Sequence, residues 1–563
     1  MSKSIRFALF GAVVLMLASC KNMQVKQEYF VIDKDPLVEE GGMVNYTVTG
    51  TFPAKTFVKN VVCTATPVLQ WEGGLVKGEP VTLQGEKVQG NNKTISWKEG
   101  GSFTYKGSFK YQPEMAESEL IVTFDATKKG KPVEIAPVHL AYGVVATEEL
   151  YSETAKGANT SASKDAFQRI IDKNKDATIK FIIQQANVRS SETNSDEVKI
   201  LKDLLKEVAG DSKNYAIKDF EVSAYASPDG GFKLNDKLAA QRMKNAESYA
   251  KGEIKRAKAN TAITSDYTAQ DWVYFQQLVQ ESKLQDKDLI LRILSMYDDD
   301  PERREAEIKN LSAVYKVLAE DILPQLRRAR LNLNYQIIGR SDEEIQEAYK
   351  SDASVLSVEE LLYAATLTED KAQKKDIYTT TSKNYPNDYR AFNNLGELAF
   401  IDGDFATAET NFKKALSLNA SAPEVNTNMG LLCLAQGKPA DAQTYFAKGG
   451  QSKENNEALG NLYIAQGQYQ RAATALKGSN TNAEALALYL NNDLAGAKKV
   501  IAAIKNADAN TAYIAAVIAA KEKDVAAATQ NLKKAISLDP SMKAKALKDM
   551  EFKMVPGLLD AIK

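Results

Sequence analysis

The stretch YASPDGGFKLNDKLAAQR, from Tyr225 to Arg242, combines a turn rich in Pro and Gly with the start of a polar helix. Such a corner could form a catalytic loop, a phosphate-binding turn or a ligand clamp, or it could only join a strand to a helix. Its glycines lack the GxGxxG spacing of a dinucleotide site. What the corner does therefore depends on the elements that position its side chains.

This chain lacks the residues that most classes of enzyme need for catalysis. The single histidine, His139, lies in an apolar run without a nearby metal-binding or acid–base partner, so we expect it to be structural. The sequence contains no P-loop, zinc-ligand pair or nucleophile elbow, and we expect no catalytic residue, no cofactor and no metal site. A hydrolase that uses two carboxylates is not excluded, because 73 acidic residues allow many pairs. The acidic run YDDDPERREAE lacks the ligand spacing of a calcium loop, and Pro301 indicates a helix start instead.

Length and composition indicate a multidomain globular protein. A chain of 563 residues is too long for one core and predicts roughly three to four domains of about 150 residues. The formal net charge of -1 gives no overall basic field, so we expect no nucleic-acid partner. Cys63 and Cys433 lie in strand-like and helix-like apolar runs, and we expect both to be buried and unpaired.

The opening MSKSIRFALFGAVVLMLASC has the pattern of a secretory signal, because Lys3 and Arg6 precede an apolar run too short to span a bilayer. The run ends in LASC, which resembles the lipobox of bacterial lipoproteins. Residues 1–19 are therefore predicted to be removed and Cys20 to be acylated, with ordinary cleavage beside an incidental cysteine as the alternative. Acyl chains would anchor the protein to a membrane. By resemblance to known sorting rules, Lys21 favours the outer membrane.

After a tether over residues 20–27, the sequence predicts a β-sandwich over residues 28–145. Short β-branched and aromatic runs alternate there with clusters of Gly, Pro, Asn and Asp, and their spacing indicates about seven strands. Residues 146–165, ATEELYSETAKGANTSASKD, are small and polar without an apolar period. This composition predicts a linker.

Residues 166–340 are predicted to form an α+β domain. A strand is expected at Ala177–Val188, and an amphipathic helix follows over residues 195–210. A second strand leads into the corner, a long helix leaves it, and the run RARLNLNYQIIG predicts a late strand.

The corner resembles the OmpA-like family of peptidoglycan-binding domains, whose pattern here runs Asn, x, x, Leu, Ser, x, x, Arg, Ala. Asn235, Leu238 and Arg242 match this pattern. Ala239 and Met243 replace the family's Ser and Ala. The resemblance covers roughly residues 165 to 340 and implies the fold of that family.

The resemblance also implies binding of the diaminopimelate residue of peptidoglycan, with Arg242 on its carboxylate and a family Asp on its ammonium group. That Asp lies fifteen residues before the helix Arg, where this chain has Ser227, although Asp229 could reach the same place. The closing LPQLRRARLNLNY resembles the family's Arg-Arg element. The candidate peptidoglycan-binding residues are therefore Arg242, Asn235, Ser227, Asp229, Arg327 and Arg328.

Residues 259–323 are an insertion relative to the family. The runs DWVYFQQLVQ, KDLILRILSMY and EIKNLSAVYKVLAEDIL predict three helices, which could form a partner surface or only enlarge the core. Residues 341–352 are expected to be a second linker.

Residues 353–545 are repetitive. Gly430 follows Gly396 by 34 residues, the tetratricopeptide period, with Phe446 and Phe412 in step. A third copy carries Gly460 at a shorter spacing of 30 residues, and degenerate copies lie on both sides. Small residues let the paired helices approach, and aromatic or Leu residues fill the seam. Five or six copies should stack into a short solenoid with a cap over residues 546–563. Its groove is expected to bind a protein partner, unless the repeats serve only as a spacer.

The expected architecture is therefore an N-terminal β-sandwich, an α+β OmpA-like domain with a helical insertion, and a C-terminal all-α solenoid. We expect a lipid-anchored, periplasm-facing outer-membrane scaffold, not an enzyme. It would bind peptidoglycan through Arg242 and a partner protein through its repeats. The alternative is an accessory subunit of an outer-membrane assembly, secretion or transport complex whose peptidoglycan site has degenerated.

Overall fold

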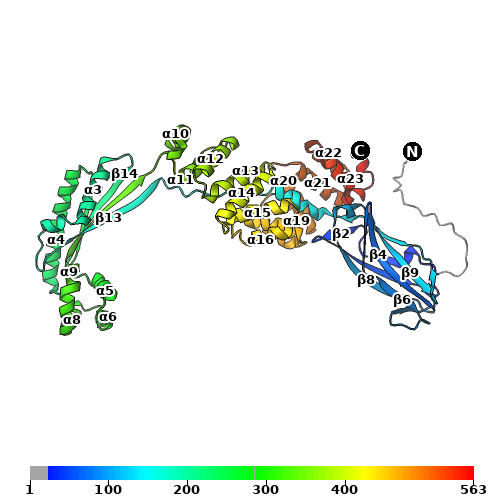
Figure 1. The fold of residues 1–563 in the computed structure, drawn as a ribbon, viewed down its shortest axis with the longest axis horizontal. Coiled ribbons are helices and arrows are strands. Elements are labelled where there is room, and N and C mark those ends of the chain that lie inside the picture. The colour runs from blue at the N-terminus through cyan, green and yellow to red at the C-terminus, as the bar shows by residue number, and fades with distance from the viewer. Residues whose placement is uncertain (1–22, 285) are drawn as a thin grey trace. The chain divides into compact units, whose positions relative to one another are not determined.

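The computed structural model describes residues 23–284 and 286–563. The predicted signal peptide over residues 1–19 and the predicted acylation site Cys20 lie outside the described residues. The described chain up to Lys164 forms one compact unit with Thr368–Lys563, and Asp165–Leu367 form a second unit. We call these the first and second units (Figure 1).

The N-terminal part of the first unit is rich in β-strands, as predicted, and they form two sheets around one core. Side chains of β3 alternate between buried and partly exposed positions, as expected for a strand with one face on a core. One sheet contains β1 (Phe30–Ile32), β2 (Leu37–Glu40), β3 (Met43–Phe52), β8 (Gly101–Lys110) and β12 (Val144–Val145). The other contains β4 (Val61–Trp71), β5 (Gly74–Lys77), β6 (Val81–Gly85), β7 (Lys93–Ile95), β9 (Ser118–Lys128), β10 (Lys131–Val133) and β11 (Val138–Tyr142). The core between them includes Leu37, Tyr46, Phe52, Leu69 and Leu120.

The C-terminal part of the first unit is an array of helix pairs. The pairs are α13 (Tyr389–Ile401) with α14 (Phe405–Leu418), α15 (Pro423–Ala435) with α16 (Pro439–Phe446), α17 (Lys453–Ala465) with α18 (Tyr469–Ala475), α19 (Asn482–Leu490) with α20 (Leu494–Ala503), and α21 (Ala509–Lys521) with α22 (Val525–Leu538). Helix α12 (Lys371–Asn384) precedes the pairs, and α23 (Met542–Lys548) and α24 (Met550–Lys553) follow them. A Cβ atom on Gly396, Gly430 or Gly460 would come within 2.6 Å of Phe412, Phe446 or Leu476 respectively. The glycines are therefore required for the close approach that the repeat spacing predicted.

The segment over residues 146–165 differs from the expected linker. A 3-10 turn, η3 (Thr147–Leu150), leads into α1 (Tyr151–Lys156). Leu150, Tyr151 and Ala155 are buried in the same core as the helix pairs. Figure 1 shows this segment in cyan among the helices of the array. The polar composition of this segment suggested a linker. The groups that bind it lie far away in the sequence, so no local pattern indicated that it is bound.

The second unit contains a four-stranded sheet with the order β13 (Ile170–Lys180), β16 (Arg328–Ile338), β14 (Tyr215–Tyr225) and β15 (Ile263–Thr268). Strand β15 runs parallel to β14, and the other pairs are antiparallel. Helices α3 (Asp196–Gly210) and α4 (Phe232–Ala257) share one core with the sheet. The first strand therefore lies earlier than the predicted Ala177–Val188.

The structure also changes the limits of the expected insertion and of the second linker. Strand β15 lies inside residues 259–323, so the inserted helices begin only after it. They are α5 (Trp272–Glu281), α6 (Lys287–Met296), α7 (Pro301–Asn310), α8 (Ser312–Val317) and α9 (Leu323–Leu326), with a π-helical turn over Leu318–Ile322. Asp300 caps α7 at the predicted helix start, with its side chain accepting from the Arg303 amide. In place of the expected linker over residues 341–352, α10 (Asp342–Asp352) forms behind a capping box at Ser341.

The second unit extends beyond the expected boundary of the α+β domain. It contains α10 and α11 (Val358–Ala364) beyond residue 340, in addition to α2 (Ser190–Thr193) within the expected limits. Residues 353–367, which were expected to begin the repeats, therefore belong to this unit.

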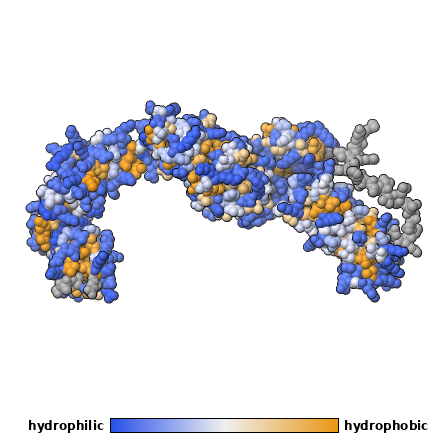
Figure 2. Space-filling model, viewed as in Figure 1, coloured by the Kyte–Doolittle hydropathy of each residue, from blue (hydrophilic) through white to orange (hydrophobic). Residues whose placement is uncertain are grey.

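On the face drawn in Figure 2, apolar residues form separate areas within a mainly hydrophilic surface. Cys63 and Cys433 are buried and unpaired, as predicted, and burial raises the pKa of their thiols to about 12 and about 11. None of the described helices is long and apolar enough to cross a membrane. Over residues 23–284 and 286–563, no group of three or more His, Cys, Asp or Glu side chains is placed to hold a metal ion.

The packing of the repeats predicts a large effect of one added methyl group. Gly430→Ala should lower the free energy of unfolding of the first unit by about 1–3 kcal/mol, because its Cβ would lie 2.3 Å from Cε1 of Phe446. The control is Gly252→Ala in α4, where nothing lies within 4 Å of the added Cβ. That change should be neutral or stabilising by up to about 1 kcal/mol. Denaturant unfolding followed by circular dichroism measures both variants, and equal effects would contradict the close approach.

Candidate functional site

The helix array holds an extended segment of its own chain, residues 158–164, which we call the strap. Helix α1 lies against α15, α17 and α19, the first helices of three successive pairs. From α1, the chain runs back toward α13, so that Asn159 bonds Glu457 of α17 and Ser163 bonds Asn394 of α13. The face formed by the first helices of the pairs, which we call the repeat groove, is therefore occupied along these pairs.

Two asparagines of the groove bind both backbone groups of alternate strap residues. Asn428 accepts from the Ser161 amide at 2.7 Å and donates to the Ser161 carbonyl at 2.8 Å. Asn394 accepts from the Ser163 amide at 2.8 Å and donates to the Ser163 carbonyl at 3.0 Å. Asn393 adds a bond to the Ser161 carbonyl at 3.0 Å. The carboxamides thus replace the neighbouring strand that an extended backbone would otherwise need.

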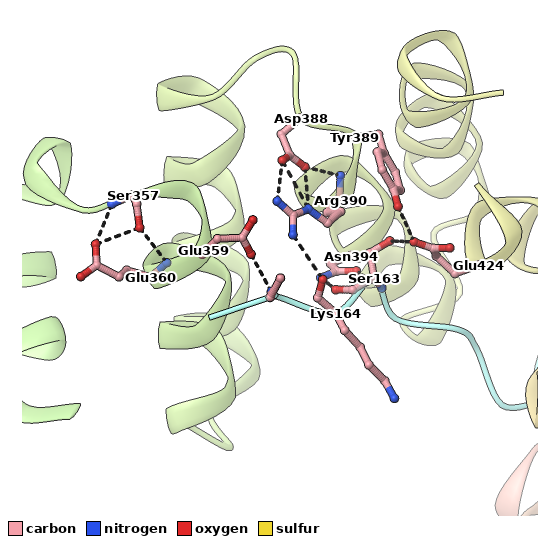
Figure 3. Close-up of polar contacts among 11 residues, drawn as sticks. Ser163, Lys164, Ser357, Glu359, Glu360, Asp388, Tyr389, Arg390, Asn394 and Glu424 are labelled. Carbon is pink, nitrogen blue, oxygen red and sulfur yellow. Dashed lines mark hydrogen bonds and ion pairs between the residues drawn. The ribbon is translucent and has the colours of Figure 1, made fainter. Parts of the chain in front are cut away.

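Carboxylates of the groove bind side chains of the strap. Glu424 accepts from the Ser163 hydroxyl at 2.8 Å and from the Tyr389 hydroxyl at 2.9 Å. Glu397 accepts from the Thr160 hydroxyl at 2.8 Å, and burial raises the pKa of this glutamate. Figure 3 shows Ser163 beside Asn394 and Glu424, and the Lys164 side chain pointing away from them while its carbonyl accepts from Arg390.

The covered groove leaves its central helix with no exposed face. Every residue of α15 from Val425 to Ala435 is buried. A helix that is buried on all sides must contact protein around its whole circumference. Here the second helices of the pairs lie on one side, and α1 with the strap lies on the other.

The β-sandwich contacts the array through buried carboxyl groups. Glu148 of η3 accepts from the Gly41 amide at 2.9 Å and from the Tyr469 hydroxyl of α18. Glu39 of β2 accepts from the Gly42 amide at 2.9 Å. Burial, followed by the charges of Glu148 and Glu149, raises the pKa of Glu39 to about 9. Burial also raises the pKa of Glu148.

A second contact joins the sandwich to the end of the array. The Thr147 hydroxyl donates to Glu551 of α24 at 3.2 Å, and the same carboxylate accepts from Tyr489 of α19 at 2.5 Å. Lys553 of α24 forms an ion pair with Glu117. Residues 546–563, which were predicted to cap the repeats, therefore contact the N-terminal part of the unit.

In the second unit, the corner after β14 gathers four of the six predicted site residues. Arg327 donates to the Ser227 hydroxyl at 3.2 Å and to the Asp229 carboxylate at 3.0 Å. The Ser227 hydroxyl in turn bonds Asp229. Asn235 donates to the carbonyls of Ser227 and Gly230 at 2.8 and 2.7 Å, which fixes the turn. Asp229 therefore already has an internal cationic partner.

The remaining two arginines are held by other groups. Arg242 of α4 is 0% exposed and donates to the carbonyls of Ile182, Gln185 and Tyr225 at 3.3, 3.0 and 2.9 Å. Burial, and then the charge of Arg327, lowers the pKa of Arg242 to about 10, so it stays charged at neutral pH. Arg328 pairs with Asp271 at 2.9 Å between the rings of Tyr225 and Tyr274. Peptidoglycan binding by these six residues stays a prediction.

Sequence reasoning did not identify the strap or its asparagines. Asn394 and Asn428 lie 34 residues apart, each two positions before a repeat glycine, at Gly396 and Gly430. A search of the repeats for recurring polar residues would have found this signal. The strap itself carries no pattern that separates it from a linker.

Comparison with known proteins identifies the repeats. The tetratricopeptide repeat family model matches residues 389–421, which span α13 and α14. No match was found among curated proteins. The chain thus contains tetratricopeptide repeats, a type of protein-interaction scaffold.

Parts of this chain are similar to parts of solved structures. A tetratricopeptide repeat protein from Parabacteroides merdae is 16% identical with a TM-score of 0.29, over 39% of this chain and 90% of that one. PilW, a type IV pilus biogenesis factor, is 20% identical with a TM-score of 0.27, over 34% and 95%. Pseudomonas aeruginosa PilF is 17% identical with a TM-score of 0.27, over 38% and 99%.

The buried carboxyl groups predict that the first unit loses stability as the pH rises. Because the pKa of Glu39 is raised from 4.5 to about 9, folding favours its protonated form. The stabilising effect is complete below about pH 4.5 and is lost as the pH rises through about 9. In Glu39→Gln, the free energy of unfolding should fall less between pH 5 and 8 than in the wild type, by at least about 1 kcal/mol.

The control for this comparison is Glu40→Gln, since Glu40 is the exposed neighbour on the same strand. It should follow the wild-type dependence on pH. Denaturant unfolding at a series of pH values measures all three proteins. Parallel curves for the wild type and Glu39→Gln would contradict the protonated state of Glu39.

Proposed function

We propose that the protein is a non-catalytic envelope scaffold whose repeat groove binds extended polypeptide, and that the strap is the segment bound in the form described here. The observation that carries this proposal is the pairing of Asn428 and Asn394 with both backbone groups of Ser161 and Ser163. Concave repeat surfaces commonly bind peptides and proteins. Here the groove binds the chain that leads from the β-sandwich, so the array also holds that domain.

The proposed location is the periplasmic face of the outer membrane, with acyl chains on Cys20 as the anchor. The lipobox-like LASC and the preceding signal pattern support this part of the proposal. A soluble body on a lipid anchor suits a scaffold that works beside a membrane.

For the second unit, the geometry favours an accessory subunit with a degenerate peptidoglycan site over a wall tether. A diaminopimelate ammonium group would have to displace Arg327 from Asp229, a charged pair in which both side chains are at most 14% exposed. A ligand carboxylate would have to reach Arg242, whose bonds go to three backbone carbonyls. Displacing Arg327 would leave its buried charge without an anionic partner, and displacing the carbonyls would leave buried acceptors without donors; both are costly. We therefore propose that this unit has the OmpA-like architecture but does not bind peptidoglycan, and that it belongs to an assembly, secretion or transport complex.

The groove contacts predict strap release on loss of one carboxamide. Asn394→Ala removes both backbone bonds to Ser163, each worth about 0.5–1.5 kcal/mol. Hydrogen exchange of the strap amides, followed by mass spectrometry, should accelerate about tenfold or more. Asn411→Ala is the matched control, because Asn411 of α14 bonds the Thr407 carbonyl of its own helix. Unchanged exchange in Asn394→Ala would contradict the proposed binding mode.

The degenerate site predicts no specific retention on the cell wall. The chain from residue 21 onward should not cosediment with purified diaminopimelate-type peptidoglycan above the level of an unrelated protein. Asp229→Asn should leave that result unchanged. The accessory role would be contradicted if the wild type cosediments, if Asp229→Asn abolishes this and if the exposed-site control Asp266→Asn does not. That result would support a wall tether.

A further inference from the structure

Helix α1 and the strap both lie in the repeat groove, and the strap is the part that can leave the groove more easily. Its seven residues, Ala158 to Lys164, include no large apolar side chain. Hydrogen bonds hold it, and each such bond stabilises a protein by only about 0.5–1.5 kcal/mol. The preceding α1 is different, because Leu150, Tyr151 and Ala155 are buried in the apolar core. Helix α1 can therefore stay in place while the strap is exchanged.

The groove recognises the strap mainly through its backbone. The bonds to Asn428 and Asn394 use the amide and carbonyl of Ser161 and Ser163, groups that nearly every residue has. The two serines are buried, whereas Ala162 and Lys164 are exposed, as expected for an extended chain with alternate sides. Inward positions thus require small side chains, and outward positions tolerate any.

The carboxylates of the groove add a chemical preference. Glu397 and Glu424 accept from the hydroxyls of Thr160 and Ser163 at 2.8 Å. An acidic residue at these positions of a ligand would face a carboxylate at short range, which is unfavourable. The preferred ligand is therefore an extended segment with small, hydroxyl-bearing residues, and no acidic residue, at the positions of Thr160 and Ser163.

Two equivalent helices carry the same backbone-reading side chain. Asn394 and Asn428 occupy one position of the repeat, 34 residues apart, and each binds a residue two positions from the other's ligand. The spacing of the helix pairs thus matches the two-residue period of an extended chain. This match belongs to the array and does not depend on the identity of the strap.

We propose that the groove between α13 and α15 is a recognition site for an extended, small-residue segment of a partner protein, and that the strap is a built-in competitor that keeps the site closed. The proposal rests on the proposed scaffold function and deepens it by naming the class of ligand. A tethered strap acts at an effective concentration on the order of millimolar. A partner segment must overcome this competition, either by binding more tightly or by adding contacts elsewhere.

A peptide-binding experiment with an opened groove tests the proposal. The probe is a fluorescent peptide with the strap sequence, GANTSASKD, residues 157–165. The full chain with Ser161→Pro and Ser163→Pro lacks the two strap amides that Asn428 and Asn394 accept from. Fluorescence anisotropy should detect peptide binding to this variant at least about tenfold more tightly than to the wild type. A probe with proline at the same two positions should bind to neither.

Ala162→Pro is the matched control. It places proline between the two serines, at a residue whose amide makes none of the groove bonds found in the described chain. The strap should then stay bound, and the peptide should bind as weakly as it does to the wild type. If the double variant does not fold by circular dichroism, Ser163→Pro alone is used, which should give a smaller gain in affinity.

Three outcomes would overturn the proposal. The first is absence of peptide binding to a folded variant whose strap amides exchange rapidly, which leaves the scaffold function standing but removes the recognition site. The second is equal binding of the proline-containing probe, which excludes backbone reading. The third is dimerisation of the wild type by strap exchange, detected by light scattering, which would identify a second copy as the occupant. Failure of the proposed function itself is distinguishable, because the strap would then exchange rapidly in the wild type as well.

Discussion

A buried extended backbone must have partners for its amides and carbonyls, and in this protein asparagine side chains supply them. Asn428 and Asn394 each satisfy both groups of one strap residue. Because these bonds exist, a polar segment can lie inside a helical array without the cost of unpaired polar groups. The chain between the sandwich and the second unit is thereby fixed in the groove. The groove in turn is covered, which explains why α15 has no exposed residue between Val425 and Ala435.

The contact of the sandwich with the array is built on different physics. Glu39 and Glu148 lie close together where both are largely removed from water, and an ionised pair there would repel. The Gly41 and Gly42 amides and the Tyr469 hydroxyl offset part of that cost by donating to the carboxyl groups. If apolar side chains formed this contact instead, its stability would not depend on pH. The carboxyl groups make the contact of the sandwich with the array depend on protonation, whereas the bonds of Asn394 and Asn428 to the strap backbone use groups that do not titrate.

The sequence predicted those features whose cause is local. The repeats followed from a 34-residue period, since Gly396 and Phe412 are the two sides of one close contact. The strand-to-helix corner followed from its Pro and Gly residues. The strap was missed because its partners lie 226 or more residues away, as Lys164 and Arg390 do. Strand β15 was missed because its residues Thr264–Thr268 are all exposed, so it has no apolar alternation.

The arginines of the corner show why a motif match is weaker evidence for a ligand than a filled site. Arg242 stands where the OmpA-like pattern has its ligand-binding arginine, yet its guanidinium joins α4 to carbonyls at the end of β14 and in the segment after β13. These bonds link the elements of the unit whether or not a ligand binds. The same sequence pattern is therefore compatible with a purely structural role of Arg242. The asparagines of the repeat groove match no ligand motif, but a polypeptide lies on them with both backbone groups paired. For this chain, the observed occupant identifies the chemistry of a site more directly than the resemblance does.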